Sequence, residues 1–388
     1  MIRRVAVTLA GPVISVLLAL LVTTLFLTFG GYSAASAYEV MWNYGIEPAS
    51  LVSSLNNAVP LYLAGVAAAF ALRMGLFNIG VDGQYRVAAL AGAVVAANLP
   101  LPLYLRLPIT LIVCCLVGAL WALVPALLKV YRGVSEVITS ILMNAIATTV
   151  VAILLADVFR SGGGQNTGTA IIGADGAMPV LIDLGIGNRT SISGFLVLAI
   201  VVGMLFYLVQ YRTVFGFTLQ VAARSPEAAE SAGIRVNRRI IAAMLGSGAI
   251  AGLIGMPHVL GTAFRFDGTL PTDLMFTGLA AALLGRSHPI GMAFGAFILA
   301  FVERSSQVLG LVQLPTEVGS VFMAVILLSS AIGYWLTERA DQRIALMNAL
   351  RKRRRGAAGS TPPAPPAPPA PPAPPAPPSA TPGMEAAR

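Results

Sequence analysis

Residues 107–128 read LPITLIVCCLVGALWALVPALL, an uninterrupted apolar run of the length that a membrane-spanning helix requires. A bilayer core of roughly 30 Å is crossed by about 20 helical residues. The whole chain of 388 residues shares this character, since 57% of its residues are hydrophobic and only 11% are charged. Soluble domains carry about 45–50% apolar and about 25% charged residues. The composition therefore excludes an ordinary cytosolic enzyme and a disordered chain, and it predicts an all-α polytopic membrane protein.

Ten apolar runs predict about ten transmembrane helices, with eight as the lower limit. They lie near 5–29, 51–72, 84–98, 107–128, 136–158, 194–210, 240–263, 272–285, 289–309 and 317–336. The third and the eighth run are short for a bilayer, so either could be a half-helix that enters and leaves by one face.

The basic residues predict the orientation of these helices. With ten spans and a cytoplasmic N-terminus, most Lys and Arg residues fall inside, and only Arg106, Arg160, Arg189 and Arg265 fall in outer loops. Cytoplasmic loops of membrane proteins carry an excess of Lys and Arg. We therefore expect both termini in the cytoplasm and a multi-pass protein of the plasma or inner membrane. The formal charge of +9 reflects this orientation and does not indicate nucleic-acid binding.

Composition divides the chain into three parts. Residues 1–340 hold all the apolar runs and are expected to form the transmembrane domain. Residues 341–360 contain the basic run 351–355, which is expected to meet anionic lipid headgroups. Residues 361–388 repeat Ala-Pro-Pro, and we expect a disordered, polyproline-rich tail.

The sequence shows no pattern for catalysis or for metal binding. It contains no G-x-x-x-x-G-K-[ST], H-E-x-x-H or G-x-S-x-G motif. Its two cysteines, Cys114 and Cys115, are neighbours in an apolar run, and its two histidines are far apart in the sequence. We therefore expect no catalytic residues, no metal site and no cofactor in this chain. ATP hydrolysis would require a separate subunit.

The longest predicted cytoplasmic connection, 211–239, contains a short helix. Pro226 suits the first turn of that helix with Ser225 as its N-cap, and Glu227 then lies where the helix dipole favours an acid. Gly233 is expected to end the helix. Such a helix could dock into a groove of a partner protein or be an ordinary surface helix. The residues expected on its small-residue face are Ala228, Ala229 and Ala232.

Two polar segments, 73–86 and 133–144, interrupt the apolar runs. The first contains three glycines, and the second repeats polar residues every four positions along one face of a helix. Polar groups at membrane depth usually face the interior of the bundle or a water-filled cavity. A translocation pathway is one interpretation, and a simple turn with helix–helix hydrogen bonds is the other. The candidate pathway residues are Asn78, Asp82, Gln84, Glu136, Ser140 and Asn144.

These segments resemble the permease subunits of ABC importers, in the class that includes ribose and branched-chain amino-acid permeases. Residues 75–84, GLFNIGVDGQ, resemble the class signature GLFNIGxEGQ, with Asp82 where Glu is usual. Residues 133–144, GVSEVITSILMN, resemble the form GVxEVIxTxMxN of nucleoside-type importers. Residues 228–255 resemble the coupling helix with the span after it, and residues 278–291 resemble the stretch AxALLGxxxPxG.

The resemblance implies a type II ABC importer-like fold and a division of labour among subunits. Two permease chains, alike or different, would form the pore, and two cytoplasmic ATPase subunits would bind ATP. An extracellular substrate-binding lipoprotein would deliver nucleosides or related small polar solutes. The resemblance also places the ATPase contact on the short cytoplasmic helix. The coupling residues expected there are Arg224, Pro226, Glu227, Ala228, Ala229, Ala232, Gly233 and Ile234.

Two alternatives remain open at the level of sequence. The same fold could carry a simple sugar or a branched-chain amino acid, because the composition of the spans does not separate these substrates. A secondary transporter driven by an ion gradient would also suit broken helices and acids within the membrane. A membrane-bound enzyme lacks a catalytic constellation.

Overall fold

The apolar runs form long helices because a helix satisfies its own backbone N–H and C=O groups where no water is present. The computed structural model describes residues 2–161, 168–185 and 191–333. These residues belong to one unit, Met1–Thr337. The predicted basic segment 341–360 and the tail 361–388 lie outside the described residues.

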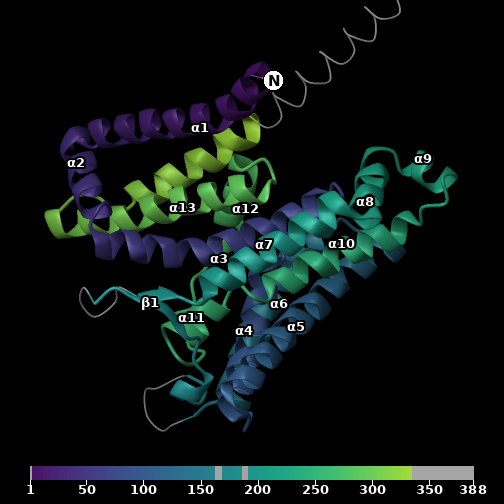
Figure 1. Ribbon diagram of the computed structural model, residues 1–388. Helices are drawn as coiled ribbons and strands as arrows, with labels where there is room; N and C mark the ends of the chain where they lie inside the picture. The colour runs from purple at the N-terminus through teal and green to yellow at the C-terminus, as the bar shows by residue number, and fades with distance from the viewer. Residues whose placement is uncertain (1, 162–167, 186–190, 334–388) are drawn as a thin grey trace, which may run out of the picture. The chain divides into compact units, whose positions relative to one another are not determined.

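Helices account for most of the described residues (Figure 1). The first half of the unit contains α1 (Ile2–Phe29), α2 (Ala34–Gly45), α3 (Pro48–Leu72), α4 (Val81–Asn98), α5 (Leu103–Arg132) and α6 (Glu136–Ile153). A π-helical turn (Leu154–Val158), a 3-10 turn (Ala174–Gly176) and the strands β1 (Val180–Asp183) and β2 (Ser191–Ser193) follow. The second half contains α7 (Phe195–Arg212), α8 (Val214–Arg224), α9 (Pro226–Ser231), α10 (Val236–Ala251), α11 (Met256–Gly261), α12 (Leu274–Leu284), α13 (Pro289–Ser306), a 3-10 turn (Gln307–Val312) and a last helix (Val318–Gly333).

The structure places helices at all ten predicted positions. Among the described residues, seven segments are long and apolar enough to cross a membrane: Pro12–Phe29, Pro48–Leu72, Leu103–Arg132, Glu136–Val158, Phe195–Arg212, Val236–Gly261 and Pro289–Val312. The other three positions are occupied by α4, α12 and the last helix. With 11 residues, α12 is about 16 Å long, roughly half of a bilayer core. The protein is thus a polytopic helical membrane protein, and the count of ten spans stays a prediction.

The bundle is built around α3, whose second half is almost entirely buried. α3 packs against α7, α10, α12 and α13. α10 also packs along α5, and α4 contacts both α5 and α6. The buried residues of α3 include a run of alanines with one glycine. Small side chains let helix backbones approach closely, which is the main source of packing energy between helices in a membrane.

The contact between α5 and α10 depends on three glycines. Gly248 of α10 and Gly252, the residue that follows the end of α10, are four residues apart, and both lie against Gly118 of α5. A Cβ atom on Gly118 would overlap the carbonyl oxygen of Gly248, and one on Gly252 would overlap the carbonyl oxygen of Cys114. The two backbones are therefore in van der Waals contact along this seam.

The predicted span 240–263 consists of two helices instead of one. α10 ends at Ala251, and α11 begins at Met256, so the residues between them form a turn. That turn contains Gly252 and Gly255, and Pro257 follows in the first turn of α11. Pro lacks a backbone N–H, so it is tolerated at the start of a helix and opposes its continuation from the preceding turn.

Two elements were not predicted from the sequence. α2 is a short helix with Ser33 as its N-cap, whose hydroxyl oxygen accepts a hydrogen bond from the N–H of Ser36. The antiparallel pair β1–β2 is attached to α3 through the amide of Asn56. Asn56 donates to the carbonyl of Ser191 at 2.9 Å and accepts from the N–H of Ser193 at 3.0 Å. These bonds join residues far apart in the chain, so no local pattern predicts them.

The glycine seam yields a prediction about stability. Gly252→Val should push α10 away from α5 and lower the free energy of unfolding by about 1–3 kcal/mol, the usual cost of overpacking. Gly173→Val is the matched control, because no atom lies within 4 Å of its Cβ position. Thermal unfolding of the purified proteins in detergent measures the difference. Equal melting temperatures for the two variants would contradict the packing described here.

Candidate functional site

The short helix predicted in the connection 211–239 is α9. It begins at Pro226 and follows α8 directly, so most of the predicted loop is helical. Ser225 occupies the N-cap position as predicted, although its side chain makes no capping hydrogen bond. Its backbone carbonyl instead accepts the first helical bond, from the N–H of Ala229, at 3.0 Å. Gly233, with φ +79°, leaves the helical conformation just after Ala232.

A Schellman motif closes the C-terminal end of α9. The N–H of Ile234 donates to the carbonyl of Ala229, and the N–H of Gly233 donates to the carbonyl of Glu230, both at 2.9 Å. This pair of bonds satisfies the last carbonyls of a helix and requires a left-handed residue, usually glycine. The prediction that Gly233 ends the helix is therefore confirmed by its geometry.

The predicted small-residue face of α9 needs one correction. Ala228 and Ala232 are exposed, but Ala229 is fully buried and does not belong to the displayed face. Ala229 packs into a cluster that includes Leu219 of α8 and Met244 of α10. Six residues make less than two helical turns, so one position must point inward to hold the helix. Arg224, Pro226, Glu227 and Gly233 are exposed, and Ile234 is half-buried.

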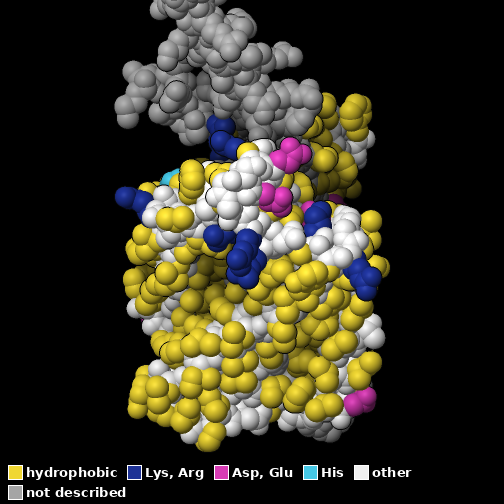
Figure 2. All heavy atoms as spheres, turned by 90° about the vertical axis from the view of Figure 1, so that its right-hand side faces the viewer, with side chains coloured by type: hydrophobic (Ala, Val, Ile, Leu, Met, Phe, Trp, Pro, Cys, Tyr) yellow, Lys and Arg dark blue, Asp and Glu magenta, His cyan; other side chains and the backbone are white. Residues whose placement is uncertain are grey.

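The end of the molecule that carries α8 and α9 is rich in charge. Figure 2 shows this end, with Lys and Arg side chains gathered in its upper part and hydrophobic side chains over most of the surface below. Arg212, Arg224, Arg235 and Arg238 are exposed on α7, α8 and the residues that lead into and begin α10. The positions of these arginines agree with the cytoplasmic side predicted from the sequence.

The predicted pathway residue Asn78 forms the centre of a buried hydrogen-bond network. Its amide nitrogen donates to Gln84 Oε1 of α4 and to Ser247 Oγ of α10, both at 2.9 Å. Gln84 Nε2 donates back to Asn78 Oδ1 at 3.0 Å, and the N–H of Gly80 donates to the same oxygen at 3.2 Å. Ser247 in turn donates to the carbonyl of Ala67 in α3 at 2.7 Å. The network connects α3, α4 and α10.

Asn144 connects α6 to the same segment. Its amide nitrogen donates to the carbonyl of Ile79, and its amide oxygen accepts from the N–H of Gly83, both at 2.8 Å. A Cβ atom on Gly83 would lie 2.9 Å from Asn144 Oδ1. The glycine thus makes room for a bidentate amide contact with the start of α4.

The other predicted pathway residues lie on either side of this network. Asp82 Oδ1 accepts a hydrogen bond from the N–H of Met275 at 3.3 Å, which ties α4 to the start of α12. Glu136 is buried and pairs with Lys129 at 2.7 Å, so it is not simply solvated at the helix end. Ser140 is fully buried, and its hydroxyl donates to the carbonyl of Glu136.

The structure therefore brings Asn78, Gln84 and Asn144 together as a clamp between helices. Their side-chain polar atoms bond one another, Ser247 or the backbone around Gly80, and the cost of burying them is thereby offset. A part in translocation stays a prediction for these residues.

A second cluster, near the predicted cytoplasmic end, was not predicted. The guanidinium of Arg73 lies 4.1 Å from the ring centroid of Tyr211, and Tyr207 stacks on Tyr211 with centroids 5.2 Å apart. His288 meets the Tyr211 ring edge-on at 5.9 Å, and the Tyr211 hydroxyl donates to the carbonyl of Ser287 at 3.2 Å. The cluster joins the ends of α3 and α7 to the turn between α12 and α13. Spans distant in the sequence supply it, so no local spacing signals it.

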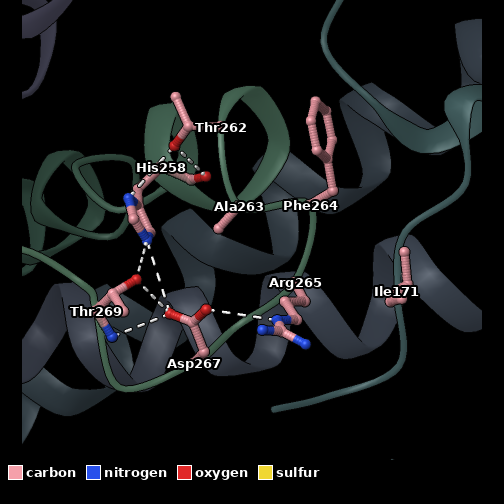
Figure 3. A pocket seen from close by; sticks show the side chains of 8 residues that line it. All are labelled: Ile171, His258, Thr262, Ala263, Phe264, Arg265, Asp267 and Thr269. Atoms are coloured by element: carbon pink, nitrogen blue, oxygen red, sulfur yellow. Dashed lines mark hydrogen bonds and ion pairs between the residues drawn. The ribbon is translucent and has the colours of Figure 1, made fainter. Parts of the chain in front are cut away.

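The sequence analysis also missed a cavity of about 620 Å³ beside α11 (Figure 3). The polar side chains of its lining are His258, Thr262, Arg265, Asp267 and Thr269. Asp267 Oδ1 accepts from the N–H and the hydroxyl of Thr269, at 3.0 and 2.6 Å. His258 Nε2 lies 3.1 Å from Thr269 Oγ1 and 3.8 Å from Asp267 Oδ1. In the sequence, the closely spaced polar residues Asp267 and Thr269 could have indicated this cavity.

Within the described ranges, no three His, Cys, Asp or Glu side chains lie close enough to hold a metal ion. The apolar helical bundle, its buried polar clamp and its displayed short helix are those of a polytopic helical membrane protein.

The chain matches the family "Branched-chain amino acid transport system / permease component" over residues 50–331, and it belongs to that family. This membership confirms the resemblance to ABC importer permeases that the sequence motifs indicated. No solved structure matches the chain significantly.

Several curated proteins are similar to this chain over most of their length. The guanosine ABC transporter permease protein NupP of Bacillus subtilis is 32% identical over 328 residues, which cover 83% of this chain and 93% of NupP. The glucose ABC transporter permease protein TsgB13 of Haloferax volcanii is 32% identical over 303 residues, 76% of this chain and 80% of TsgB13. The nucleoside ABC transporter permease protein NupB of Lactococcus lactis is 26% identical over 329 residues, 83% of this chain and 90% of NupB.

The buried clamp predicts a loss of stability on truncation. Asn78→Ala should leave the Gln84 amide without its partner and remove one of the two hydrogen bonds of Ser247, and so lower the free energy of unfolding by about 1–3 kcal/mol. Asn98→Ala is the matched control, because Asn98 is an exposed residue of α4 whose amide donates to the carbonyl of Val94 in the same helix. Thermal unfolding in detergent compares the two. An Asn78→Ala protein as stable as the control would show that the clamp does not hold the helices together.

Proposed function

We propose that this chain is the permease subunit of an ABC importer that moves nucleosides across the inner membrane. The observation that carries the transport role is α9, a short capped helix exposed at the basic end of a helical bundle. The nucleoside assignment is supported by the names of NupP and NupB and by the segment 133–144. The chain itself would catalyse no reaction and would bind no cofactor.

The proposed partners follow from the same division of labour. Two cytoplasmic ATPase subunits would bind ATP and contact α9 from the cytoplasmic side of the membrane. A second permease chain, identical or different, would complete the pore, and an extracellular lipoprotein would deliver the solute. The exposed arginines around α9 and the neighbouring lipid headgroups are of opposite charge, so membrane lipids are expected to surround this end.

The packing of α9 offers a mechanical route from the ATPases to the bundle. Ala229 anchors α9 in a hydrophobic cluster with Leu219, Val236 and Met244. Val236 and Met244 belong to α10, which packs tightly against α5 through glycines and against α3. A displacement of α9 on ATP binding would therefore move α10 with it, since close-packed elements transmit small shifts.

A sugar permease is the second candidate function. TsgB13, named as a glucose permease, is as similar to this chain as NupP is, at 32% identity. The similar proteins therefore support an ABC permease more strongly than they support a nucleoside over a sugar as its substrate. An ion-driven transporter is the third candidate and would need no ATPase.

Uptake of labelled guanosine by cells with and without this chain tests the substrate. Guanosine uptake should fall when the chain is deleted. In wild-type cells, excess unlabelled glucose or ribose should leave guanosine uptake unchanged. Competition by glucose would move the assignment to sugars. Uptake that persists after loss of the partner ATPase would favour the ion-driven alternative.

Ala228→Arg tests the coupling role of α9. Ala228 is exposed on the helix, so a bulky cation there should weaken ATPase docking without disturbing the fold. We expect the substitution to cost about 1.4 kcal/mol of binding free energy, which lowers the affinity of the ATPase for the permease about tenfold. Copurification of the ATPase with the permease measures this affinity. Ala35→Arg, at an exposed alanine of α2, is the matched control. Normal copurification and normal uptake in Ala228→Arg would refute the assignment.

A further inference from the structure

The cavity beside α11 lies at the end of the molecule away from α9 (Figure 1). Its lining comes from α11, from the segment 262–269 and from Ile171. The orientation predicted from the basic residues places Arg265, which also lines it, on the extracellular side. A volume of about 620 Å³ falls within the roughly 300–1,000 Å³ typical of small-molecule sites. The cavity is thus large enough for a solute and faces the side from which a solute would enter.

The apolar part of the lining holds an aromatic ring in an unusual position. Phe264 has φ +51° and a side chain that is 38% exposed. Its carbonyl accepts from the N–H of Ile172 at 2.7 Å, and the N–H of Phe266 donates to Thr169 Oγ1 at 3.0 Å. A bulky residue at positive φ is costly and persists only where its surroundings fix it. The chain therefore keeps an exposed ring beside the cavity at the expense of backbone strain.

The polar part of the lining retains hydrogen-bonding capacity. Partial burial raises the pKa of Asp267, but hydrogen bonds from Thr269 and Arg265 outweigh it and hold that pKa below its usual value. The carboxylate is then charged at neutral pH. A carboxylate has about four lone-pair sites, and the contacts with Thr269 and with Arg265 Nε, at 3.4 Å, account for three. One acceptor site is left for a ligand hydroxyl.

Taken together, the two parts of the lining suit a solute with a flat ring at one end and hydroxyl groups at the other. Aromatic rings attract one another in offset or edge-on arrangements. An ionised carboxylate accepts hydrogen bonds from sugar hydroxyls. Figure 3 shows His258, Asp267 and Thr269 grouped together, Phe264 on the same segment 262–269 with its ring extending to the other side, and Ile171 on a separate segment.

We propose that this cavity is an extracellular receiving site for a nucleoside, with the base against Phe264 and the ribose hydroxyls at Asp267. The proposal rests on the proposed function and adds to it the residues that first meet the solute. A free sugar would use only the polar part of the site and should bind more weakly.

Protection of an introduced cysteine tests the site directly. Ile171→Cys replaces a side chain that is 74% exposed and lines the cavity. The complete transporter in intact cells is treated with a membrane-impermeant thiol reagent, with or without free guanosine. Guanosine at ten times its Kd should slow the modification about tenfold by mass action, and free ribose at the same concentration should slow it less.

Two controls make the result specific. Leu181→Cys lies on exposed strand β1 outside the cavity lining, so guanosine should not change its modification rate. The unmodified chain reports the background from Cys114 and Cys115, which are buried and half-buried. Adding Phe264→Leu to Ile171→Cys should reduce the protection by guanosine, because it removes the ring and keeps an apolar side chain.

The outcomes separate the two proposals. If wild-type cells take up guanosine but neither Ile171→Cys nor a second variant, Thr262→Cys, is protected, the receiving site is wrong and the proposed function stands. If guanosine protects the cysteine while wild-type cells take up none, the site stands and nucleoside transport is wrong. Equal protection by ribose and guanosine would overturn the role of Phe264.

Discussion

Within the hydrocarbon of a membrane, every polar group has to find its partner inside the protein, and this constraint shapes the bundle. Asn78 meets it by bonding Gln84 and Ser247, so one amide holds three helices at a fixed separation. Asn144 adds a fourth helix through backbone groups of the same segment. These bonds are possible only because glycines and alanines let the backbones come close. The hydrogen bonds of the polar clamp therefore depend on the close packing of the small residues.

The same segment explains why a transporter would tolerate so many polar residues in its spans. A clamp built from side-chain amides fixes the start of α4 and leaves Asp82 to bond the start of α12. The hydroxyl of Tyr85 reaches the carbonyl of Pro271, one turn further along α4. α4 is thereby tied both to the centre of the bundle and to the segment that precedes α12. The polar residues of 73–86 thus position helices relative to one another.

Local signals in the sequence predicted the features that local chemistry decides. Apolar length predicted where the helices lie, and Pro226 and Gly233 predicted the limits of α9, because a helix start and a left-handed end need only neighbouring residues. Features that depend on distant contacts were missed. Ala229 is buried because α8 and α10 cover it, and the strands β1 and β2 are held by Asn56. The cavity beside α11 likewise needs Ile171 and Asp267 to meet, which no spacing in the sequence reveals.

One stretch of chain joins the two ends at which the proposed function acts. Val236 lies in the hydrophobic cluster with Ala229 of α9, and His258 lines the cavity at the other end. Between them, α10 and α11 are separated by the turn that contains Gly252, which is pressed against α5. A rigid helix carries a displacement along its length, and a turn converts it into a change of angle between two helices. Movement of α9 would thus reach the cavity through α10 as a reorientation of α11, which is the kind of change that releases a solute from an outward-facing site.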